Sequence, residues 1–329
     1  MSTKLSKVLH QLFLACLLSI LFTSCKNEAN KERADTAPPV AENNTDDLFF
    51  KISLAQWSLS KPTLQGDMDP LDFAQKANEM GFEGIEYVSG LYNPWLEKNG
   101  KTPEAMQTLL DTLKKRSERY EVENVLIMVD GEGDLATPDE QKRNQAVENH
   151  KKWVDAADFL GAESIRVNLF GSNEPEVWKT ASIEGLKDLA EYAAGKNINV
   201  LVENHGSLSS NAALLVEVME GVNMTNCGTL PDFGNFCLQR KESSCAEEYP
   251  KYQGVEEMMP HAKAVSAKSY DFDENGQETT IDFERMLKIV QDAGYTGYIG
   301  IEFEGHNMTA EEGIIATKEL LIEEGKKLN

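Results

Sequence analysis

The feature that most constrains this chain is an eightfold alternation of strand-like and helix-like segments between residues 49 and 329. We expect strands at Lys51–Leu59, Gly84–Ser89, Val122–Val129, Ser164–Phe170, Asn199–Asn204, Cys227–Asp232, Ala262–Tyr270 and Tyr298–Phe303. We expect helices over Pro70–Met80, Pro103–Arg119, Glu140–Leu160, Glu176–Ala194, Ser210–Glu220, Gly254–Pro260, Asp282–Ala293 and Ala310–Lys326. Five glycines stand where helices should end, namely Gly81, Gly161, Gly195, Gly221 and Gly294.

Strands that alternate with helices along a chain form a parallel sheet. Eight repeats in about 280 residues is the size of a (β/α)8 barrel. A doubly wound open sheet is the alternative, but it more often carries a Gly-rich phosphate turn after its first strand. The segment QWSLSKP has no such turn, and we find no linker inside residues 49–329. The sequence therefore predicts an α/β fold, a (β/α)8 TIM barrel in a single domain.

Three carboxylates stand at the C-terminal ends of expected strands: Glu203, Asp232 and Glu302. That end of a (β/α)8 barrel is where active sites are built. Carboxylates that converge there repel one another unless a cation or a shared proton compensates them. We therefore expect these three to lie close enough to share a divalent metal ion. Further polar residues follow the same alternation, which predicts a polar barrel mouth, and they are Arg166, Asn168, His205, Ser266, Lys268 and Glu304.

Five short motifs occur in order along the expected strands. They are GIE at 84–86, LVENHG at 201–206, PDFGN at 231–235, AK at 267–268 and IE at 301–302. Together they resemble the xylose-isomerase-like TIM barrels, the sugar phosphate isomerase/epimerase superfamily. The resemblance covers essentially all of residues 49–329 and is not specific for a substrate.

The resemblance implies a divalent metal held by Glu203, Asp232 and Glu302. The chain departs from the family pattern at Ser266, where a histidine ligand is expected, and at Asn235, where relatives often have histidine. The loss of the imidazole donor favours Mn2+ or Mg2+ over Zn2+, because oxygen ligands suit harder ions. It also leaves open whether a metal binds.

The chemistry implied by the resemblance is proton transfer at a carbon next to a carbonyl, with Glu203 and Glu302 as base and acid. Lys268 would stabilise the oxyanion, or would only form a salt bridge with neighbouring acids. The side chains expected to contact the substrate are Glu86, Arg166, His205 and Asn235. Glu86 and Arg166 have the alternative of a barrel-mouth ion pair.

The N-terminus indicates export. Lys4 and Lys7 precede the apolar run 12–22, and LFTSC then resembles a bacterial lipobox in which Cys25 is lipidated. We expect a signal peptide at 1–24, a disordered tether at 25–48 and the barrel at 49–329. The alternative is an ordinary secretory signal. We therefore expect the protein in the bacterial cell envelope, with the domain facing the periplasm or the cell surface. Its only attachment to the membrane would be the lipid on Cys25.

The net charge and the expected export of the protein exclude some classes of partner and substrate. The formal net charge of −23 makes nucleic acid a poor partner. An exported domain meets few sugar phosphates, and the loop DFDENG at 271–276 is acidic where a phosphate site needs amides and cations. We therefore expect a sugar isomerase or epimerase that acts on an unphosphorylated sugar or glycoside. The alternatives are a lyase that acts on 3-keto-glycosides and a non-catalytic carbohydrate-binding lipoprotein; the oligomeric state stays open.

Two smaller features complete the sequence expectations. Cys237 and Cys245 flank a short polar loop and can pair in an exported protein, whereas Cys227 belongs to a buried strand. The spacing from Asp271 to Asp282 matches a calcium loop. No helix precedes that loop, so an Asn-Gly turn that closes a small hairpin explains it better.

Overall fold

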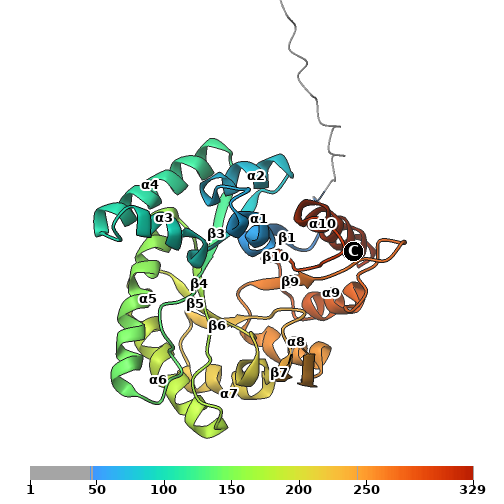
Figure 1. Cartoon of the computed structure of the whole chain (residues 1–329). Helices are drawn as coiled ribbons and strands as arrows, with labels where there is room; N and C mark the ends of the chain where they lie inside the picture. The colour runs from blue at the N-terminus through green and yellow to red at the C-terminus, as the bar shows by residue number, and fades with distance from the viewer. Residues whose placement is uncertain (1–44, 46, 243, 329) are drawn as a thin grey trace, which may run out of the picture. The chain divides into compact units, whose positions relative to one another are not determined.

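A computed structural model describes residues 45, 47–242 and 244–328 and shows a (β/α)8 barrel (Figure 1). Its parallel strands are β1 (Lys51–Ala55), β2 (Gly84–Val88), β3 (Glu123–Met128), β4 (Ser164–Val167), β5 (Asn199–Glu203), β6 (Cys227–Leu230), β9 (Val265–Ser269) and β10 (Tyr298–Phe303). The predicted signal peptide, Cys25 and nearly all of the predicted tether lie outside the described residues.

The strands follow one another around the barrel in sequence order. The eight-stranded sheet runs β6-β5-β4-β3-β2-β1-β10-β9, and every neighbouring pair is parallel. Two isolated parallel bridges close the circle: Thr229 of β6 pairs with Ala262 just before β9, and Asp232 just after β6 pairs with Ser266 of β9. All strand C-termini therefore open at one mouth, as expected for this fold.

Helices surround the strands, as Figure 1 shows. They are α1 (Ser60–Gln65), α2 (Phe73–Glu79), α3 (Asn93–Lys98), α4 (Pro103–Arg119), α5 (Glu140–Leu160), α6 (Pro175–Ala194), α7 (Ala212–Val222), α8 (Lys251–Met258), α9 (Phe283–Asp292) and α10 (Ala310–Lys327). Each of the eight predicted helices is present, and α4 and α5 have the predicted bounds. In the described part of the chain, no helix combines the length and the apolar character needed to cross a bilayer.

Several boundaries differ from the predictions. The first strand ends at Ala55 rather than Leu59, because Gln56–Leu59 forms a 3-10 turn that enters α1. Gly221 does not end a helix, since α7 continues to Val222 and the left-handed residue that follows it is Asn223 (φ 50°). Gly161 does end α5 in the left-handed conformation (φ 77°), as glycine at a helix terminus allows.

The sequence did not predict α1, α3 or an antiparallel hairpin at the barrel mouth. The hairpin consists of β7 (Cys237–Lys241) and β8 (Ser244–Glu248). A Cys237–Cys245 disulfide spans it, with Cα atoms 5.6 Å apart, which confirms the predicted pairing. Cys227 is buried and free, also as predicted.

Two layers of apolar side chains stabilise the barrel. The larger layer packs strands against helices, and a smaller cluster that includes Val88, Leu126, Leu201 and Leu230 shares the inward-facing positions of the strands. Leu201 stands two residues before Glu203, and Leu230 two residues before Asp232. Strand alternation therefore stacks apolar side chains below and carboxylates above them at the mouth.

Candidate functional site

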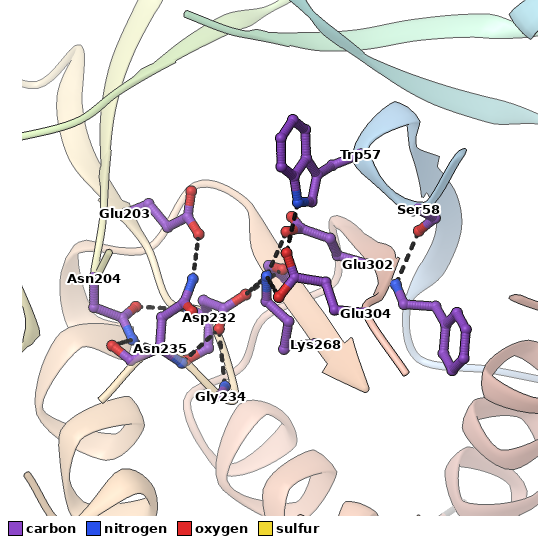
Figure 2. A network of polar contacts seen from close by, with 12 residues as sticks. Trp57, Ser58, Glu203, Asn204, Asp232, Gly234, Asn235, Lys268, Glu302 and Glu304 are labelled. Atoms are coloured by element: carbon purple, nitrogen blue, oxygen red, sulfur yellow. Dashed lines mark hydrogen bonds and ion pairs between the residues drawn. The ribbon is translucent and has the colours of Figure 1, made fainter. Parts of the chain in front are cut away.

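The three strand-end carboxylates converge in the barrel mouth, as predicted. Glu203 ends β5, Asp232 follows β6 and Glu302 lies in β10. Each offers one oxygen, and these oxygens lie within 4.8 Å of one another. All three side chains are buried, Asp232 completely. We call this group the carboxylate centre (Figure 2).

Asp232 is the most firmly held member of the carboxylate centre. Its Oδ1 accepts hydrogen bonds from the backbone N–H groups of Gly234 and Asn235, both at 2.8 Å. Its Oδ2 accepts one from the Ser266 hydroxyl at 2.7 Å. The Asn204 side chain clamps the Asp232 backbone from the neighbouring strand, accepting from its N–H at 2.7 Å and donating to its C=O at 3.0 Å. Ser266, where a histidine was expected, thus orients Asp232.

Glu203 keeps one oxygen open. Asn235 Nδ2 donates to Glu203 Oε1 at 2.8 Å, which links the two motifs on β5 and after β6. Arg166 Nε lies 2.9 Å from Glu203 Oε2, but both atoms lack a hydrogen bond because the N–H is not aimed at the oxygen. Arg166 therefore supplies positive charge while its N–H and this Glu203 oxygen remain available to a ligand.

Lys268 lies among carboxylates on the opposite side of the mouth. Its ammonium contacts Glu302 directly, lies 3.4 Å from Glu304 Oε2 and 4.0 Å from Asp232 Oδ2. Trp57 donates its indole N–H to Glu304 Oε1 at 2.5 Å. Burial lowers the pKa of Lys268, but the surrounding carboxylates outweigh it and raise that pKa well above its usual value. Lys268 is therefore a permanent cation at the centre.

Burial raises the pKa of two acids of the carboxylate centre, Glu203 and Asp232. It raises the pKa of Glu203 to about 7, against the attraction of Arg166. It likewise raises the pKa of Asp232 to about 7, against Lys268. At Glu304 burial acts in the same direction, but Lys268 and the Trp57 hydrogen bond win and lower its pKa. Glu203 is therefore poised to gain and lose a proton near neutral pH.

Two predicted substrate contacts occupy different depths. Glu86 is almost fully buried inside the barrel, where it accepts a hydrogen bond from Ser53 at 2.6 Å, and burial raises its pKa to about 7. His205 lines a cavity of about 470 Å3 together with Lys268 and Asn235. Its Nδ1 is buried without a hydrogen-bond partner, and burial lowers its pKa, so a neutral imidazole faces the site.

Sequence reasoning missed two members of the site, Asp130 and Trp57. Asp130, directly after the predicted third strand, accepts hydrogen bonds from Arg166 at 3.0 Å and from Asn168 at 2.9 Å. Its position at a strand end is the same signal that identified the other carboxylates. Glu304 shares the alternation of Glu302, but no residue pattern linked it to Trp57, which is separated from it by 247 positions.

The Asp271–Asp282 loop is a small hairpin rather than a calcium loop. Phe272 and Glu278 form an antiparallel bridge, and Gly276 has φ 77°. Asp273 Oδ1 accepts from the backbone N–H groups of Asn275 and Gln277. This oxygen therefore serves the turn itself.

Comparison with known families agrees with the geometry. The family model described as "Xylose isomerase-like TIM barrel" matches residues 74–324. Among curated proteins, the C-glycoside deglycosidase alpha subunit of Arthrobacter globiformis is 44% identical over 50 residues. That segment covers 15% of this chain and only 14% of the relative.

Solved structures show the same fold at low sequence identity. The IOLI protein with a bound zinc atom has a TM-score of 0.63 and 15% identity, covering 84% of this chain and 99% of that one. The 3-keto-D-glucoside 4-epimerase YcjR from E. coli has a TM-score of 0.61 and 13% identity, covering 83% and 98%.

Proposed function

The chain belongs to the xylose isomerase-like TIM-barrel family, and from this premise we propose that it is a sugar isomerase or epimerase. Its reaction is proton transfer at a carbon next to a carbonyl of an unphosphorylated sugar or glycoside. The observation that carries the proposal is the carboxylate centre, in which two glutamates on different strands lie close together beside a buried lysine. The substrate class is part of the proposal; the proposal names no single sugar and no direction of the reaction.

The residues present fit a divalent cation. Three carboxylates offer oxygens within 4.8 Å of one another, a separation that ligands of one ion can have. Five acids meet at the mouth, Asp130, Glu203, Asp232, Glu302 and Glu304, while Arg166 and Lys268 are the only cations that pair with them in the described chain. When ionised, the acids exceed these cations by three charges (5 − 2). Glu203, Asp232 and Glu302 would hold Mn2+ or Mg2+, which supplies Lewis-acid polarisation of substrate oxygens when bound.

The proton steps belong to the two glutamates. One carboxylate takes the proton from the carbon next to the carbonyl, so that the C–H electron pair forms the enediolate. The other returns a proton, either to the opposite face of the same carbon for epimerisation or to the adjacent carbon for isomerisation. In isomerisation the hydroxyl proton on the first carbon also passes to the former carbonyl oxygen. A pKa of about 7 lets Glu203 act in both directions near neutral pH. The Lys268 ammonium stabilises the negative charge that develops on oxygen.

The neighbouring side chains position the reacting groups. Asn235 fixes the Glu203 carboxylate, and Ser266 with the 234–235 backbone fixes Asp232. His205 Nδ1 and Arg166 Nε are buried and make no hydrogen bond in the described structure, although Arg166 Nε is ion-paired with Glu203, so a substrate hydroxyl can supply a hydrogen-bond partner. Glu86 lies deeper, where its charge interacts with those of Glu302, Glu203 and Arg166.

A lyase is the second candidate. The partial match to a C-glycoside deglycosidase subunit and the fold shared with a 3-keto-D-glucoside epimerase favour it. In a 3-keto-glycoside the same carboxylate would remove the proton from C2, the C1–aglycone bond would break, and the second acid would protonate the leaving group. Both candidate reactions therefore begin with the same proton abstraction. In the isomerase the resulting electron pair takes up a proton at carbon, whereas in the lyase it expels the aglycone.

Export is also part of the proposal. Lipidation at Cys25 would tether the barrel in the cell envelope, where free sugars and glycosides are available. Neither isomerisation nor β-elimination consumes a soluble nucleotide, which suits that compartment.

Exchange with solvent tests the proposed function. The protein is incubated in D2O with Mn2+ and, separately, with free ketoses, with 3-keto-glucose and with 3-keto-glycosides, and products are followed by NMR. Deuterium at the carbon next to the carbonyl supports proton transfer; release of the aglycone selects the lyase, and a new sugar isomer selects the isomerase. Where exchange occurs, Glu118→Gln on the outer helix α4 should behave like the wild type. If no compound in the panel gains deuterium or changes, the site is a binding pocket.

A further inference from the structure

A large groove adjoins the carboxylate centre and is not explained by chemistry on a single sugar ring. Its volume is about 980 Å3, and it shares Trp57, Arg240, Tyr270 and Glu304 with the smaller cavity that contains Lys268. Cavities of this size hold drug-sized ligands, so there is room for more than one sugar residue. The groove extends outward to α1 and to the start of α10.

The groove contains unpaired positive charges, although the chain as a whole is strongly negative. Its two carboxylates are already compensated, Glu304 by Lys268 at 3.4 Å and Glu311 by Lys76 at 2.5 Å. Lys61 and Arg240, which also line it, have no carboxylate within 4 Å anywhere in the described ranges. A protein of net charge −23 thus presents, in one groove, two cations that form no ion pair with the described carboxylates.

Both cations are placed by the fold. Lys61, in α1, donates from Nζ to the Gly305 carbonyl at 2.9 Å and lies 3.1 Å from His306 Nδ1. Arg240 projects from β7, and the Cys237–Cys245 disulfide holds that strand to β8. The lining of the groove also includes apolar side chains, among them Leu64, which is 66% exposed. A sugar or aglycone can pack on these side chains while a charged substituent reaches the cations.

We propose that Lys61 and Arg240 bind an anionic substituent, a carboxylate or a sulfate, so that the substrate is an acidic glycoside. This inference rests on the proposed function, because it assumes that the reacting sugar lies at the carboxylate centre. Glu203, Asp232 and Glu302 repel an anion at the carboxylate centre, whereas Lys61 and Arg240 attract one in the groove. The charge pattern therefore sets which end of the substrate enters the barrel mouth.

Calorimetric titration of the full-length chain tests the inference with three related disaccharides: cellobiose, cellobiouronic acid and cellobiose 6′-sulfate. We expect at least one anionic probe to bind about tenfold more tightly than cellobiose at low ionic strength, since charge-assisted hydrogen bonds are the stronger ones. The advantage should shrink in 0.3 M salt. Comparison of the two acids shows whether the groove prefers a planar carboxylate or a sulfate.

Variants distinguish binding by Lys61 and Arg240 from a general effect of the positive charge of the protein. Arg240→Gln and Lys61→Gln should each reduce the preference for the anionic probe several-fold and abolish it together, with a much smaller change for cellobiose. Lys115→Gln, which removes one charge from the exposed face of α4, is the matched control and should retain the preference. Equal affinity of the wild type for all three probes, or an anion preference that survives the double substitution, would overturn the inference. Deuterium exchange in the proposed-function test depends on Glu203 and Glu302, so the two proposals can fail separately.

Discussion

At the scale of single residues, burial and charge give the mouth its chemical character. Burial raises the pKa values of Glu203 and Asp232 to about 7, although the hydrogen bonds from Asn235 and Ser266 act in the opposite direction. Lys268 remains charged because carboxylates surround it. The same side chains in solvent would be ordinary acids and bases.

Removal of either proton-transfer group should abolish most turnover. Glu203→Gln and Glu302→Gln preserve size and one oxygen but remove the base, so we expect a loss of about 10²-fold or more in kcat. The measurement is the initial rate on whichever substrate exchanges deuterium, at saturating Mn2+, with bound metal quantified in each variant. Glu118→Gln serves as the control. Full activity in both site variants would move the chemistry to Lys268 or His205.

Gly300 should tolerate no side chain, although it lies in a regular strand. A Cβ there would lie 2.3 Å from Glu86 Oε1, and that carboxylate is confined inside the barrel by Ser53. We expect Gly300→Ala to lower the free energy of unfolding by about 1–3 kcal/mol in denaturant titrations. Gly195→Ala, where the nearest atom is 3.5 Å away and φ is −64°, should be neutral or stabilising.

A double-mutant cycle identifies the cause at Gly300. In a Glu86→Ser background the added methyl group has room, so Gly300→Ala should cost less than in the wild type. An undiminished cost would locate the strain elsewhere in β10.

At the scale of elements, the mouth is assembled from strand ends and from connections that the helix–strand alternation does not specify. The hairpin β7–β8 lines the smaller cavity through Cys237, Arg240 and Cys245. A two-stranded ribbon has little stability of its own in water. Its disulfide therefore matters more for the order of the mouth than for the barrel.

Loss of the disulfide should loosen the hairpin selectively. In the double variant Cys237→Ser/Cys245→Ser we expect faster amide hydrogen exchange at residues 237–248, with unchanged protection in β2 and β3. Reduction of the wild type should reproduce the effect. Equal protection of the hairpin before and after loss of the bridge would show that packing against the barrel holds it.

At the scale of the whole molecule, metal and protons should compete for the carboxylate centre. Glu86, Glu203 and Asp232 have native pKa values of about 7, above their unfolded values of 4.5, 4.5 and 3.8. The native state therefore binds protons more tightly, and the stability that these groups contribute is present at low pH and lost as pH rises through 7. A bound cation needs the deprotonated carboxylates and restores stability above pH 7.

The thermal midpoint should report this competition. At a hundredfold excess over Kd, Mn2+ should stabilise by about 2.7 kcal/mol, which is roughly 5 °C for a domain of this size, at pH 8. At pH 5.5 the shift should be much smaller. Asp232→Asn should remove the response at pH 8. A shift that is independent of pH, or unchanged in Asp232→Asn, would place the ion outside the carboxylate centre.

The predicted lipid anchor also belongs to this scale. Expression of Cys25→Ser should release the protein from the membrane fraction, measured by fractionation and blotting, because the polar segment 26–47 that remains after removal of the signal peptide has no apolar run to hold the bilayer. Retention of the variant in the membrane fraction would contradict lipidation at Cys25.

The sequence by itself determined the barrel, its main helices and the carboxylate centre. Periodicity is a local property, and parallel strands place their C-terminal residues at one mouth, so Glu203, Asp232 and Glu302 could be brought together without coordinates. The Cys237–Cys245 disulfide was predicted separately, from the short spacing of the two cysteines and the expected export of the protein.

Only the tertiary structure decided the charge pairing and the shape of the mouth. Trp57 meets Glu304 across 247 residues, Glu86 is buried because Gly300 leaves space for it, and Arg240 reaches the groove from a hairpin that no periodicity indicated. These contacts depend on side-chain direction and on loops between the repeats. Such features are set by packing in three dimensions, where residues distant in sequence share one low-dielectric pocket.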